Sequence, residues 1–137
     1  MRHTVVEREL ELQLVLSPEH SIPVAARLAY RTDDPYAVHI GFHIDSAHPV
    51  HWAFARELLV EGVFRPCGHG DVRVWPAKSE GRAVVLIGLS SPDGDALLEA
   101  PAGQVSAWLE RTLVACPPGS EGGRLGLDDG LADLLTR

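Results

Sequence analysis

Histidines are the side chains of this sequence best suited to chemistry, because the chain carries seven of them. His39 and His43 lie four residues apart in an alternating apolar segment, which predicts one strand face and a separation of about 13 Å. Two imidazoles that far apart cannot hold one metal ion. His48 and His51 are nearer in sequence, but Pro49 and a turn separate them. No Cys-x-x-Cys or His-Glu-x-x-His spacing occurs, so we expect no metal site.

Candidate nucleophiles and carboxylates lack the partners that catalysis needs. Cys67 and His69 are close in sequence, but a working Cys/His pair usually joins residues distant in sequence, with a third group orienting the base. Ser90-Ser91 lies outside any Gly-x-Ser-x-Gly motif. Asp33-Asp34 and Asp128-Asp129 fall at expected turns or helix caps, where Asp bonds the local backbone. We therefore expect no enzyme and no cofactor.

Length and composition predict one domain that needs no metal or disulfide to fold. The chain has 137 residues, of which 45% are hydrophobic and 23% charged. Its two cysteines are expected to be free thiols. The formal net charge is −7 and the cations are spread along the chain, which disfavours nucleic-acid binding. We find no signal-peptide pattern and no long apolar run, so we expect a cytoplasmic protein without membrane insertion.

Alternating apolar and polar residues predict four consecutive strands, at residues 9–16, 24–30, 38–44 and 50–54. Short turns separate them, so we expect an antiparallel meander. The third strand should place its even-numbered residues, up to Ile44, on one apolar face. A short helix is expected over residues 55–61, closed by Gly62 in a left-handed conformation.

Three further strands are predicted at residues 71–75, 82–89 and 96–100, the first of them stopped by Pro76. A long helix should follow Pro101, with an apolar stripe of Val105, Trp108, Leu109, Thr112, Leu113 and Cys116. Residues 119–137 suggest a Gly-rich linker and a short helix over residues 127–135, packed on the same domain. The fold class is thus α+β: residues 1–118 form one domain of antiparallel β-sheets with a mid-chain and a C-terminal helix.

The aromatic side chains suggest where a partner protein binds. Trp75 shares its predicted strand face with Asp71 and Arg73, so either it covers a subunit contact or a partner site, or a neighbouring helix covers it. Trp108 lies on the apolar stripe and is expected in the core, while its helix is also a candidate surface for self-association. The residues taken as candidate partner contacts are Arg56, Glu57, Glu61, Asp71, Arg73, Trp75 and Trp108.

Four segments in this order and spacing resemble the SsgA-like sporulation and cell-division proteins of actinobacteria. They are Asp-Pro-Tyr-Ala-Val at residues 34–38, Phe-Ala-Arg-Glu-Leu-Leu-Val-Glu-Gly at 54–62, Gly-Asp-Val-Arg-Val-Trp-Pro at 70–76, and the turn and strand at 90–101. The resemblance runs from about Val24 to Pro118, with looser similarity outside those limits. No family motif marks a binding residue, so no candidate contact is carried over from the family.

The resemblance implies a non-enzymatic role in sporulation-specific septation. Members of the family help to position the tubulin-like protein FtsZ, or bind it and promote its assembly at septum sites. The implied partners are FtsZ, an SsgA-like paralogue and further copies of the chain, with a trimer expected, and the implied location is the division septum. The family fold resembles the whirly-type single-stranded nucleic-acid binders, so an alternative function is single-strand binding, which the acidic charge argues against.

Overall fold

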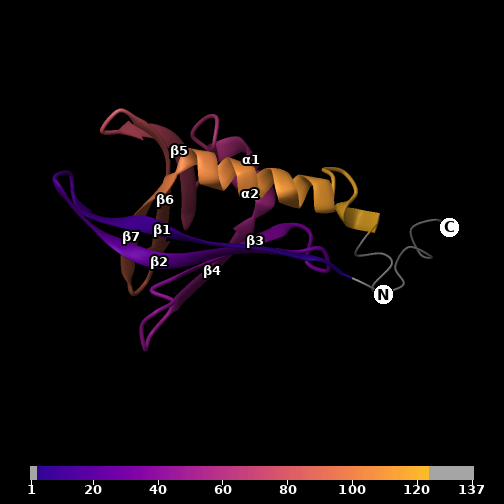
Figure 1. Ribbon diagram of the computed structural model, residues 1–137, viewed down its shortest axis with the longest axis horizontal. Helices are drawn as coiled ribbons and strands as arrows, with labels where there is room; N and C mark the ends of the chain where they lie inside the picture. The colour runs from indigo at the N-terminus through magenta and orange to yellow at the C-terminus, as the bar shows by residue number, and fades with distance from the viewer. Residues whose placement is uncertain (1–2, 124–137) are drawn as a thin grey trace.

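The computed structural model describes residues 3–123, whose strands form one antiparallel sheet of seven strands (Figure 1). The strand order is β4-β3-β2-β1-β7-β6-β5. The strands are β1 (Val5–Ser17), β2 (His20–Arg31), β3 (Ala37–Phe42), β4 (Val50–Ala55), β5 (Val72–Ser79), β6 (Arg82–Ser91) and β7 (Gly94–Pro101), and the helices are α1 (Arg56–Gly62) and α2 (Ala102–Ala115). This arrangement confirms the α+β class. The helix expected over residues 127–135 lies outside the described residues.

The two groups of strands form a single sheet, where the sequence suggested separate sheets. The junction is the pairing of β1 with β7, and it consists of the pairs Gln13↔Glu99 and Leu14↔Leu98. The first group, β1 to β4, is a meander as predicted. The second group, β5 to β7, is also joined by consecutive antiparallel pairs.

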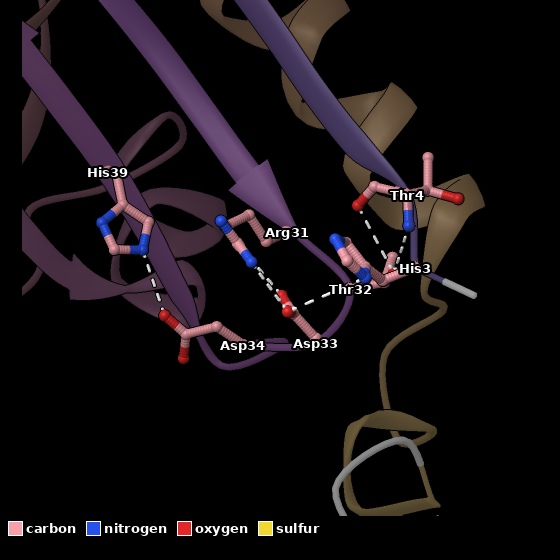
Figure 2. Close-up of polar contacts among 7 residues, drawn as sticks. All are labelled: His3, Thr4, Arg31, Thr32, Asp33, Asp34 and His39. Atoms are coloured by element: carbon pink, nitrogen blue, oxygen red, sulfur yellow. Dashed lines mark hydrogen bonds and ion pairs between the residues drawn. The ribbon is translucent and has the colours of Figure 1, made fainter. Parts of the chain in front are cut away.

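Strand β1 begins four residues earlier than predicted, because its start is tied to the end of β2. Val5 pairs with Arg31, and beyond that pair Thr4 and Thr32 bond each other. The Thr4 N–H donates to Thr32 Oγ1 at 2.7 Å, and the Thr32 N–H donates to the Thr4 carbonyl at 3.0 Å (Figure 2). Thr32 is 1% exposed, and the Thr4 N–H satisfies its buried hydroxyl.

Both helices pack on one face of the sheet. Helix α2 crosses it as the orange helix of Figure 1 and contacts β1, β6 and β7, while α1 contacts β5 and β4. Five of the six residues of the predicted stripe are buried, namely Val105, Trp108, Leu109, Thr112 and Cys116, and Leu113 is partly buried. The indole Nε1 of Trp108 donates to the Val6 carbonyl at 3.0 Å. Neither described helix is long and apolar enough to span a bilayer.

Pro76 does not stop the fifth strand, and that prediction was wrong. Strand β5 continues to Ser79. The Val74 N–H and carbonyl both bond Cys67, at 2.9 and 2.8 Å, so Val74 directs its polar backbone groups away from β6. These directions alternate along a strand, and Pro76 therefore also faces the open edge of the sheet. There its missing N–H removes no ladder bond.

Strand β3 ends at Phe42 and does not reach Ile44, contrary to prediction. His43 has φ of 56°, in the left-handed region, and this reverses the chain. The Ser46 N–H donates to the His43 carbonyl at 3.0 Å and closes the turn. As a result, His39 and His43 do not share a strand face.

Arg56 is the one charged side chain that is buried among residues 3–123, with 2% of its surface exposed. Its guanidinium donates to the Thr112 carbonyl at 2.9 Å and to Glu121 Oε2 at 2.9 Å, and it lies 4.8 Å from the centroid of the Tyr30 ring. Burial raises the pKa of Tyr30 far above its ordinary value, so the ring stays neutral. One side chain thus joins β2, α1, the end of α2 and the stretch expected to be a linker.

Replacing Arg56 with alanine is expected to destabilise the protein by about 3 kcal/mol, because Glu121 and the Thr112 carbonyl lose their buried donor. Urea unfolding followed by circular dichroism measures the change. The matched control is Arg27→Ala, since Arg27 forms an exposed 3.5 Å pair with Glu9 and should cost less than about 1 kcal/mol. Equal effects for the two variants would contradict the structural role of Arg56.

Glu121 should make stability depend on pH. The pKa of its carboxyl is lowered from 4.5, first by its own backbone N–H and further by Arg56 and the Gly119 N–H. A lowered folded-state pKa stabilises the protein above pH 4.5, and this contribution is lost as the pH falls through the folded value. The difference in unfolding free energy between the unmodified protein and Glu121→Gln should therefore be largest near pH 6 and shrink toward pH 3. A difference that stays constant over this range would refute the assignment.

Gly62 is needed for space and not for a left-handed conformation. It is the buried last residue of α1, and Val63 caps the helix with φ of −72°. A Cβ on Gly62 would lie 2.3 Å from Val74 Cγ1, so Gly62→Ala should destabilise by about 3 kcal/mol. Gly103 in α2 has no atom within 4 Å of such a Cβ, and Gly103→Ala should stabilise by up to about 1 kcal/mol. Thermal melting of both variants tests the contrast, which fails if Gly62→Ala is tolerated.

Candidate partner-binding surface

The predicted contact residues do not form one surface. Arg56 and Trp108 are 2% and 0% exposed, so neither side chain is available at the surface of the described chain. Trp108 lies in the core as its place on the stripe indicated. Arg56 carried no such signal, because a cation at the start of a short helix normally points into solvent.

Glu57 and Glu61 lie on α1, on the helix-covered face of the sheet. Glu57 is exposed. Glu61 is partly buried, and its Oε2 accepts from the Arg65 guanidinium at 2.7 Å, an i,i+4 pair. This pair leaves Glu61 less able to recruit a partner's cation than Glu57.

Arg73 and Trp75 lie together on the opposite face. They alternate along β5 with Val74, which is fully buried and faces Gly62 of α1. Neither α1 nor α2 therefore covers Trp75, and within residues 3–123 the reading that a neighbouring helix covers it does not hold. The indole lies on Gly88 of β6, where an added Cβ would be 3.4 Å from the ring. Because Gly88 has no side chain, the half-buried indole of Trp75 packs directly against the backbone of β6.

Two adjoining hollows flank Arg73 and Trp75. One, of about 640 Å³, lies between β5 and the preceding loop and is also lined by Pro66, Cys67, Gly68 and His69. The other, of about 410 Å³, extends toward β6 and β7 across the outer face of the sheet, which is the face opposite α1 and α2. It is also lined by Val15, Gly70, Gly88, Ser90, Asp95 and Leu97. We define the β5 surface as His69, Arg73, Trp75 and Leu97.

The charge of Arg73 is available to a ligand. Arg27, Arg31 and Arg65 each pair with a carboxylate, whereas no carboxylate of residues 3–123 pairs with Arg73. Arginine and tryptophan are the residue types that most often dominate binding energy at protein interfaces. Asp71 is exposed just before β5, and its carbonyl accepts the Ser90 N–H at 2.8 Å. The β5 surface therefore combines Arg73, whose charge no carboxylate of residues 3–123 neutralises, the aromatic ring of Trp75 and the two adjoining hollows.

Two further features escaped the sequence analysis. Phe64, just after α1, is 77% exposed, although its type suggested burial. Asp34, His39 and His51 are brought together by the turn before β3 and by the pairing of β3 with β4. The signal that could have found this group is the register of the two strands, which periodicity does not give.

Comparison with known proteins gives consistent matches. Residues 24–121 match the sequence profile of the family described as SsgA, Streptomyces sporulation and cell division protein. The chain is 54% identical over 134 residues to sporulation-specific cell division protein SsgB of Streptomyces coelicolor, covering 98% of both chains. It is 47% identical over 135 residues to SsgB of Frankia casuarinae, covering 98% of this chain and 94% of that protein.

Two solved structures share the fold. One, from work entitled "Mutations in SsgB correlate to longitudinal cell division during sporulation of Streptomyces coelicolor", has a TM-score of 0.86 at 56% identity and covers 89% of this chain and 96% of that one. The other, an SsgA-like sporulation-specific cell division protein from Thermobifida fusca, has a TM-score of 0.85 at 41% identity and covers 95% of each chain. The chain therefore belongs to the SsgA-like family of sporulation and cell division proteins, as its residues predicted.

Proposed function

We propose that this protein is a non-enzymatic adaptor that binds FtsZ and promotes its assembly at sporulation septa. Membership of a cell-division family supports the general role. The β5 surface supports the binding mode, because no carboxylate of residues 3–123 pairs with Arg73, and Arg73 lies next to Trp75 between two hollows. The observation that carries the proposal is that Arg73 and Trp75 lie two residues apart on a sheet face that neither α1 nor α2 covers.

Self-association would raise the affinity of such a surface. A homo-oligomer, a trimer by family resemblance, presents several copies of one weak site to a filament, and its avidity can exceed the single-site affinity by about 10²–10⁴. Trp108 and the stripe of α2 are buried within one chain, so the proposed contacts between copies must use other surfaces. An SsgA-like paralogue is the second proposed partner. In this proposal the protein is cytoplasmic and reaches the division septum by binding these partners.

Single-stranded nucleic-acid binding remains the alternative, and the outer sheet face offers it little support. Glu7, Glu9 and Glu11 alternate along β1 and are all exposed on that face, at the centre of the sheet. Such a row repels phosphates, whereas single-strand binders combine cations with stacking aromatics. The resemblance to whirly-type binders stays a prediction of the family likeness.

The binding proposal predicts that the purified protein increases the pelleting of FtsZ under assembly conditions. Trp75→Ala and Arg73→Glu should each weaken the apparent affinity at least about tenfold, because both remove anchor groups. Matched controls are Tyr36→Ala, an aromatic that is 53% exposed elsewhere, and Arg82→Glu, an exposed cation at the far end of the β5–β6 hairpin. Both controls should bind as the unmodified protein does.

The possible failures of this experiment have different meanings. Unchanged FtsZ pelleting and filament length with the unmodified protein would reject FtsZ binding. Normal binding by Trp75→Ala and Arg73→Glu would reject the β5 surface alone. A monomeric mass in sedimentation equilibrium would reject the avidity argument. Fluorescence anisotropy with a labelled oligonucleotide at low salt completes the series, and saturable binding at micromolar protein would favour the alternative.

A further inference from the structure

Three side chains outside the β5 surface form a chain of hydrogen bonds on the outer face of the sheet. His39 Nε2 lies 3.1 Å from Asp34 Oδ2, a contact marked by a dashed line in Figure 2. On its other side, His39 Nδ1 lies 3.1 Å from His51 Nε2. Asp34 comes from the turn between β2 and β3. The register His39↔Ala53 and Gly41↔His51 makes the two histidines diagonal neighbours on one face of β3 and β4.

Asp34 determines which nitrogen of a neutral His39 is free. A carboxylate only accepts hydrogen bonds, so the His39 proton lies on Nε2, where it is donated to Asp34. The lone pair of His39 Nδ1 then points at His51 Nε2. A carboxylate on one ring nitrogen and an unprotonated second nitrogen is the arrangement found around histidines that bind metals.

The spacing of the two facing nitrogens suits one metal ion. Zinc–imidazole bonds of about 2.0–2.1 Å in a tetrahedral site place two ligand nitrogens about 3.3 Å apart. The observed 3.1 Å is within a few tenths of an ångström of that value. The His39 side chain is 23% exposed and His51 is exposed, so the ion enters from solvent. The two nitrogens now face each other along a hydrogen bond, so the His51 ring must turn until its Nε2 leaves the axis of the His39 lone pair and both lone pairs converge on the ion.

We propose that His39 and His51 form a two-imidazole site for a zinc-class divalent cation, with Asp34 as the positioning residue. On binding, the His51 proton moves from Nε2 to Nδ1, so both rings stay neutral and each gives the metal one lone pair. Imidazole ligands favour Zn²⁺ and Co²⁺ over Mg²⁺ and Ca²⁺, which prefer oxygen. Within residues 3–123 no third protein ligand joins them, so water completes the coordination. This site differs from the His39–His43 pair that the sequence analysis rejected, and it is independent of FtsZ binding.

Isothermal titration of the metal-free full chain with Zn²⁺, and absorption spectroscopy with Co²⁺, test the site. One Zn²⁺ should bind per chain, and His39→Gln and His51→Gln should each weaken binding at least about tenfold. Asp34→Asn should weaken it by about 10–100-fold while keeping the Co²⁺ spectrum, because the ligands themselves are unchanged. His20→Gln and His48→Gln are exposed controls that should bind normally, and Mg²⁺ should not bind.

Imidazole nitrogen NMR of the unmodified protein keeps the proposal testable if a variant fails to fold. Zn²⁺ should shift the His39 Nδ1 and His51 Nε2 resonances and leave those of His20 and His48 unchanged. No saturable binding at 1 mM Zn²⁺ would overturn the proposal. Full binding by both ligand variants, or equal losses in the two controls, would also overturn it.

Discussion

The packing of α2 across the junction of β1 and β7 is the contact on which the rest of the structure depends. That junction has two register pairs, and their hydrogen bonds contribute only about 1 kcal/mol each. Trp108 alone removes roughly 200 Å² from water, which corresponds to an upper value of about 5 kcal/mol. Its indole also bonds the Val6 carbonyl in β1. Helix packing, more than strand pairing, therefore makes one sheet from two groups of strands.

Arg56 extends this arrangement to the end of α2. A buried guanidinium is costly unless it is fully paired, and Arg56 meets this condition through the Thr112 carbonyl, the Glu121 carboxylate and the Tyr30 ring. These groups come from both halves of the chain, so the charge ties the meander to the C-terminal region. The same burial withdraws Arg56 from partner binding and leaves Arg73 as the unpaired cation of the β5 surface.

Local patterns predicted the features that depend on one element at a time. The period-two alternation of β1 to β4 and the apolar stripe of α2 both appear in the structure, because burial of one face imposes these periods. The errors arose where a residue's environment came from another element. Pro76 is tolerated because it faces the sheet edge, and Gly62 is required because Val74 packs against it. Strand β3 ends at His43 because this residue adopts a positive φ, which its residue type did not predict.

The amino-acid order alone was enough to identify the α+β class and the core position of Trp108, since both follow from residue types at fixed spacing. The family was identified from the resemblance of four segments to known members. The amino-acid order could not say that Arg56 is buried on Glu121, 65 residues away, or that His39 meets His51 across 12 residues. Nor could it separate Arg73 and Trp75 from the other candidate contacts. Those outcomes depend on strand register and on which face the helices cover, and both come from long-range packing that no local period encodes.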